Sequence, residues 1–135
     1  MTGNMDYEPQ YLAGAKFFND CEFFEAHEVW EDLWTEAQGP SRSFYQGLIQ
    51  LAVALHHFGN GNHRGAKKLY HSSRSYLQPY LPSYLGCDTE QLFVEMEECF
   101  RELLQCNEDT SGIEINPEWI PEIHLDPSVS AVGEE

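Results

Sequence analysis

The segment His27-Glu28-Val29-Trp30-Glu31 places side chains that could bind a metal ion on one predicted helix. It imitates the His-Glu-x-x-His helix of zinc proteases, with glutamate in place of the last ligand. His27 and Glu31 lie one helical turn apart, and His57 could complete a three-ligand zinc site with an open position for water. Glu28 would then act as general base on that water. This pattern predicts a metal-dependent hydrolase as an alternative function.

The same residues belong to a polar stripe on helical faces that are otherwise apolar. One face of the predicted helix is aromatic and consists of Phe23, Phe24, Trp30 and Trp34. Projected at about 100° per residue, His27 lies in the middle of this face and Glu31 one turn further along it, so we expect both to point inward. A second stripe on the next helix consists of Gln46, Gln50 and His57. The predicted binding site joins the two stripes: His27, Glu28, Glu31, Trp34, Gln46, Gln50 and His57.

Three interpretations of these stripes remain open at the level of sequence. Buried polar groups are normally satisfied, so the stripes could form a hydrogen-bonded network that only fixes helix register. They could hold zinc, as described above. They could also line the site of a non-enzymatic module that binds a protein partner or a small ligand, which is our main hypothesis.

The charged residues fall into three blocks. The 135-residue chain has 23 acids and seven bases, a net charge of −16, which disfavours binding to nucleic acid. Residues 41–86 contain no acid but hold five of the seven bases: Arg42, Arg64, Lys67, Lys68 and Arg74. Either this basic segment packs between acidic helices that complement its charge, or it frames a pocket for a small anion.

Composition predicts one folded, cytoplasmic domain. The chain is 41% hydrophobic, and its length suits a single core. It has no apolar run of the roughly 18 residues that cross a bilayer. The four cysteines form no Cys-x-x-Cys pair, so we expect reduced thiols. A homo-oligomer remains open.

Hydrophobic periodicity predicts an all-α fold, a compact multihelical bundle of about five helices. We expect helices over residues 11–18, 21–36, 44–58, 63–77 and 89–104, with the third at the centre. The first four form two hairpins, and Phe18, Ala26 and Trp30 recur forty residues later as Phe58, Ala66 and Tyr70. We place the bundle domain at 1–106 and an extended C-terminal tail, packed partly on the bundle, at 107–135.

Two motifs carry a family resemblance, at residues 24–34 (FEAHEVWEDLW) and 44–52 (FYQGLIQLA). They resemble domain of unknown function family 309, small helical proteins with no established activity. The resemblance implies a multihelical fold and a shared site rather than a known reaction. The family's characteristic positions match His27, Glu28, Glu31, Trp34, Gln46, Gly47 and Gln50 here.

Overall fold

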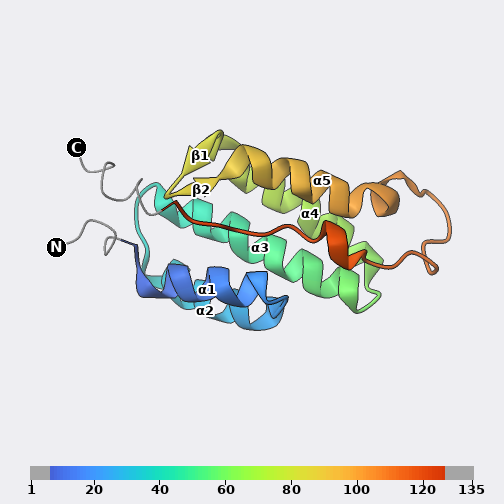
Figure 1. The fold of residues 1–135 in the computed structure, drawn as a ribbon, viewed down its shortest axis with the longest axis horizontal. Helices are drawn as coiled ribbons and strands as arrows, with labels where there is room; N and C mark the ends of the chain where they lie inside the picture. The colour runs from blue at the N-terminus through green and yellow to red at the C-terminus, as the bar shows by residue number, and fades with distance from the viewer. Residues whose placement is uncertain (1–6, 127–135) are drawn as a thin grey trace.

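A computed structural model describes residues 7–126 of the chain. It is an all-α fold of five long helices, which confirms the predicted fold class (Figure 1). Their bounds are α1 (Pro9–Asn19), α2 (Phe23–Glu36), α3 (Ser41–Gly59), α4 (His63–Leu77) and α5 (Thr89–Gln105). The part of the predicted tail beyond residue 126 lies outside the described residues.

A close contact joins α1 to α2. Trp30 of α2 is fully buried, and its indole Nε1 donates to the carbonyl oxygen of Tyr11 at 3.3 Å. Gly14 of α1 lies directly against this ring, because a Cβ added there would come within 2.0 Å of Nε1. The two helices can therefore pack this closely only with glycine at position 14.

The central helix α3 has α2 on one side and α4 on the other. Both run antiparallel to it, since each begins beside the end of α3 and ends beside its start. At the first end, Phe24 of α2 lies 5.7 Å from the ring of His56. At the other end, Tyr76 of α4 lies against Gly47 of α3. Helices α2 and α4 thus both pack against α3, and the apolar run through the middle of α3 predicts this central position.

Helix α5 closes the core over α3 and α4. Phe100 of α5 lies 5.2 Å from Phe58 and 4.8 Å from Tyr70, measured between ring centroids. A short 3-10 helix (Gln78–Tyr80) and an antiparallel hairpin of β1 (Ser83–Tyr84) and β2 (Cys87–Asp88) connect α4 to α5. The hairpin was not predicted, because two-residue strands are too short to show periodicity.

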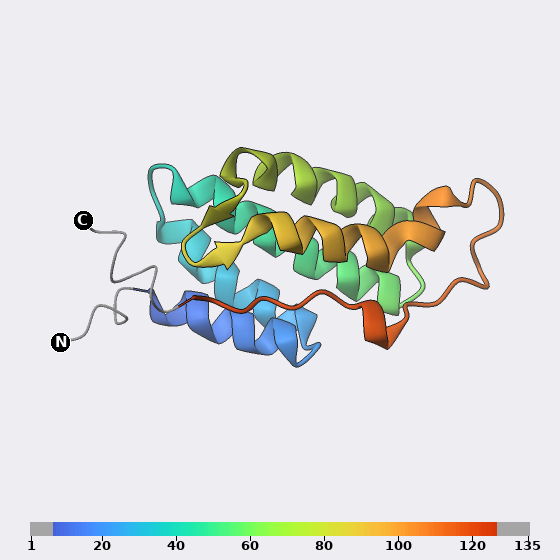
Figure 2. The same cartoon turned by 45° about the horizontal axis from the view of Figure 1, so that its top comes forward.

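The chain after α5 runs back along the bundle as an extended segment, between α1 and α5 in both views (Figures 1 and 2). It includes a 3-10 turn at Pro117–Trp119. The side chain of Asn19 holds the segment by two hydrogen bonds, donating to the carbonyl oxygen of Ile123 at 2.8 Å and accepting from its N–H at 2.7 Å. Within residues 7–126, no helix is long and apolar enough to cross a membrane.

Candidate functional site

One side of α3 is left uncovered between α2 and α4. Ten of its nineteen residues are buried, but Gln46, Gln50, Val53 and His57 remain partly exposed. We call these four residues the α3 strip. They share one face because their positions fall within about 60° of arc at 100° per residue. The strip contains the second predicted polar stripe, and it is a surface rather than the floor of a sealed core.

Gln50 lies at the middle of the α3 strip, and its side-chain oxygen is buried. This Oε1 is the one buried side-chain polar atom without a hydrogen-bond partner in residues 7–126. A buried acceptor left without a donor costs about 1–3 kcal/mol. No described residue donates to this oxygen, and the interpretation of the stripes as a satisfied network stays a prediction.

The first predicted stripe borders the strip but does not point into the core. The His27 side chain is 21% exposed and its Nε2 lies 3.8 Å from Glu31, whose side chain is 56% exposed. The expectation that Glu31 points inward is wrong, because it lies 100° around α2 from the fully buried Trp30. Glu28 is exposed as well.

Phe24 is a second correction on the same helix. It is 47% exposed, whereas Phe23 and Trp30 are buried and Trp34 is partly buried. The predicted four-residue aromatic face is therefore a three-residue face, since adjacent residues on a helix point 100° apart. Phe24 packs instead against the imidazole of His27, with 5.3 Å between ring centroids.

His57 pairs elsewhere. Its Nδ1 lies 3.3 Å from the side-chain amide of Asn62, at the turn between α3 and α4. Across the described part of the chain, no three His, Cys, Asp or Glu side chains lie close enough to hold a metal ion. The predicted set of His27, Glu31 and His57 therefore does not fit zinc as placed, and no catalytic step follows for Glu28.

A pocket of about 230 Å³ opens at the end of the strip near the start of α3. Its lining comes from α2, α3 and α4 and consists of Trp34, Arg42, Ser43, Gln46 and Tyr76. The guanidinium carbon of Arg42 lies 4.1 Å from the centroid of the Trp34 ring, and its Nη1 donates to the carbonyl oxygen of Ala37 at 3.3 Å. We call this the Arg42 pocket.

Arg42 is a base without an acidic partner in the described part of the chain. None of the ion pairs in residues 7–126 includes it, although the chain is rich in carboxylates. Trp34 and Gln46 were predicted as binding residues, but Arg42, Ser43 and Tyr76 were not. The available signal was the position of Arg42 in the acid-free segment 41–86.

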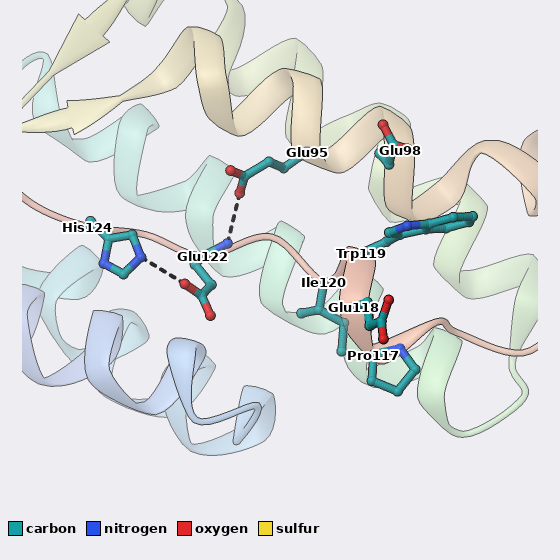
Figure 3. Close-up of a pocket in the computed structure, with 8 residues that line it drawn as sticks. All are labelled: Glu95, Glu98, Pro117, Glu118, Trp119, Ile120, Glu122 and His124. Atoms are coloured by element: carbon teal, nitrogen blue, oxygen red, sulfur yellow. Dashed lines mark hydrogen bonds and ion pairs between the residues drawn. The ribbon is translucent and has the colours of Figure 1, made fainter.

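A larger cavity, about 560 Å³, lies elsewhere, between α5 and the C-terminal segment (Figure 3). Four glutamates, Glu95, Glu98, Glu118 and Glu122, line it together with Trp119. Three of them already have partners. Glu95 accepts from the backbone N–H of Glu122 at 3.0 Å, and the Glu122 carboxylate pairs with His124 at 2.8 Å (Figure 3). Glu98 lies 3.7 Å from Arg101 in an ion pair. None of the predicted binding residues lines this cavity.

Comparison with known proteins identifies the segment that carries the site. Residues 11–69 match the family model described as domain of unknown function (DUF309). This segment belongs to that family. The DUF309 segment spans α1, α2, α3 and the first half of α4. It contains the α3 strip, every predicted binding residue and Arg42, so the resemblance carried by the two motifs is confirmed.

Two relatives share this region. The chain is 35% identical over 91 residues to the uncharacterized protein YpuF of Bacillus subtilis (strain 168), a match that covers 65% of this chain and 52% of YpuF. It is 37% identical over 57 residues to an uncharacterized protein of Aquifex aeolicus (strain VF5), covering 41% of this chain and 17% of that protein. The chain thus spans about half the length of YpuF and a smaller share of the second relative.

Proposed function

We propose that this protein is a non-enzymatic binding module whose Arg42 pocket accepts a small ligand bearing a carboxylate or similar oxyanion. One observation carries the proposal: the Arg42 guanidinium is held against Trp34 in a pocket, and no carboxylate of residues 7–126 pairs with it, in a chain with 23 acids. This choice follows the small-anion interpretation of the acid-free segment.

The donors around the pocket suit an oxyanion. Stacking on Trp34 and the hydrogen bond to Ala37 fix the plane of the guanidinium and leave its other N–H groups available. The side chains of Ser43, Gln46 and Tyr76 also line the pocket and make no hydrogen bond to other described residues. Arginine binds a carboxylate through two parallel hydrogen bonds, so the ligand would gain orientation as well as charge pairing.

The size of the pocket limits the ligand. A volume of about 230 Å³ corresponds to roughly eight water molecules at ~30 Å³ each, enough for a few heavy atoms. A ligand this small reaches only a few kcal/mol of binding free energy, so we expect dissociation constants on the order of 1 mM for simple carboxylates.

Titration of the ¹⁵N-labelled protein with sodium acetate and sodium benzoate, at constant ionic strength, tests the proposal. We expect saturable shifts at the amides of Ser43 and Gln46. Hydrogen bonds to a charged group contribute about 1.5–3 kcal/mol, so Arg42→Gln should weaken binding at least tenfold. Arg101→Gln, at an exposed base of α5, is the matched control and should leave the dissociation constant unchanged.

Three results would reject the proposal: no saturable shift up to about 100 mM, equal binding by Arg42→Gln, or an equal loss in the Arg101→Gln control.

The zinc-hydrolase alternative, which no observation in residues 7–126 favours, has a separate test. About one metal ion per chain in protein purified without a histidine tag, lost in both His27→Ala and Glu31→Ala, would establish the metal site and justify a search for hydrolase substrates.

A further inference from the structure

The two helices that border the α3 strip carry opposite charges. Helix α2 has five acids and no lysine or arginine, and α4 has four bases and no acid. Of the four bases, Arg74 alone forms an ion pair among the described residues, with Glu97 of α5 at 3.0 Å. Arg64, Lys67 and Lys68 form none with any described residue. Within residues 7–126, Arg74 is therefore the one base of α4 that is paired with an acidic side chain.

The opposite charges on α2 and α4 also lie at the same distance along the axis of α3. Both helices begin beside the end of α3, where Phe24 packs on His56 and Gly65 packs on His57. Glu28 is five residues after the start of α2 and Lys68 is five residues after the start of α4, so each lies about 7.5 Å along its helix. Opposite charges thus flank the strip at the same level.

We propose that this face, formed by α2, the α3 strip and α4, pairs with the same face of a second copy of the chain. A two-fold axis parallel to α3 exchanges the two borders, so that α2 of each copy lies over α4 of the other. Glu28 and Glu31 then face Lys68 and Arg64 twice in one isologous interface. An axis across α3 would instead place acids over acids and bases over bases.

The centre of the face suits this arrangement. Gln50 lies on the strip close to such an axis and would meet its own counterpart in the second copy. Gln50 is partly exposed, and its exposed atoms would make this contact, whereas the buried Oε1 lies below the surface. Phe24 and Tyr76, 47% and 38% exposed, would add apolar area at opposite ends of the face.

The area of the face predicts a weak dimer. Nineteen residues make α3 about 28 Å long, and three helices at 8–10 Å spacing are about 20 Å wide, giving a footprint of about 560 Å² per chain. Stable interfaces bury about 800 Å² per partner. We therefore expect a dissociation constant of tens of micromolar, with strong dependence on salt.

Sedimentation equilibrium over a concentration series, in a low-salt buffer at pH 7, tests the proposal by charge exchange. The wild type should pass from 15.5 kDa to twice that mass. Arg64→Glu/Lys68→Glu and Glu28→Lys/Glu31→Lys should each weaken dimerisation at least tenfold, because attraction becomes repulsion at both borders. An equimolar mixture of the two variants should restore the dimer, since acids and bases then meet again at both borders.

The control exchanges charges on the exposed face of α5, by Arg101→Glu/Glu102→Lys, and should dimerise as the wild type does. Circular dichroism checks that every variant is folded. A wild type that stays monomeric up to about 1 mM overturns the proposal, as do reversed variants that dimerise normally. A mixture that fails to restore the dimer would also overturn it, because complementary borders are the basis of the predicted pairing. None of these variants alters the Arg42 pocket, so failure here leaves the proposed ligand site standing.

Discussion

Replacing Gly14 by alanine should destabilise the protein sharply, even though alanine is the better helix former. The added Cβ would lie 2.0 Å from Nε1 of Trp30 and 2.4–2.5 Å from two more ring atoms. To reach ordinary contact at 3.4 Å, the indole would have to move by 1.4 Å away from α1. Trp30 is fully buried against Phe18, so no free space receives it.

The expected size follows from three contributions. Overpacking a core of this kind costs about 1–3 kcal/mol, and a separation of only 2.0 Å between the added Cβ and the indole places this case at the upper end. Moving the indole also strains its hydrogen bond to Tyr11, worth about 1 kcal/mol. The higher helix propensity of alanine stabilises the variant by about 1 kcal/mol and offsets part of this loss. We expect a net loss of about 3 kcal/mol, or roughly 10 °C in melting temperature.

Urea unfolding followed by circular dichroism measures this change, with Gly59→Ala as the matched control. Gly59 is the last residue of α3, and a Cβ there meets no atom within 4 Å. The control should therefore gain about 0.4–1 kcal/mol through the unfolded state. If Gly14→Ala were as stable as the wild type, the close packing of α1 on Trp30 would be refuted.

Three further substitutions follow from the structure. Gln50→Leu removes the buried unpaired Oε1, so unfolding in urea should show a change between zero and about 1 kcal/mol of stabilisation; a clear loss would mean that the amide has a partner. Asn19→Ala removes both hydrogen bonds to Ile123. Relative to the wild type, amide hydrogen exchange should accelerate more at residues 119–125 than in α3, and equal acceleration in both would mean that these bonds do not hold the segment. Burial raises the pKa of the Cys87 and Cys99 thiols to about 12, so their contribution to stability is complete below pH 9 and is lost as pH rises from 9 to 12. Cys99→Ala should therefore lose less stability between pH 8 and pH 11 than the wild type, and an equal slope would contradict the assignment.

The helices were predictable because apolar periodicity and turn residues are local signals. Helix α4 begins and ends as predicted, at His63 and Leu77, since Asn62 caps its start and Pro79 follows its end. The polar positions of α3 were also found by periodicity alone. Their environment was not, because the depth of each side chain depends on how closely neighbouring helices approach α3.

The lining of the Arg42 pocket was predictable only in part. Trp34 and Gln46 were predicted because they lie on stripes that periodicity can detect. Arg42 reaches Trp34 only because the chain turns between α2 and α3 and brings the two helix ends together. Contacts of this kind depend on loop geometry, which a single sequence does not specify. For the same reason, the sequence did not show that the three candidate zinc ligands lie apart in residues 7–126, where His57 contacts Asn62 at another turn.

The forty-residue repeat separates what the fold requires from what it leaves free. Ala26 and Ala66 occupy equivalent positions and are both fully buried, so packing constrains them. Glu28 and Lys68 are also equivalent, yet both are exposed and differ in sign. Charge exchange at exposed positions usually changes folding stability by less than about 0.5 kcal/mol. The fold of one chain therefore does not explain this difference, whereas contact between two copies would, and only association distinguishes the two cases.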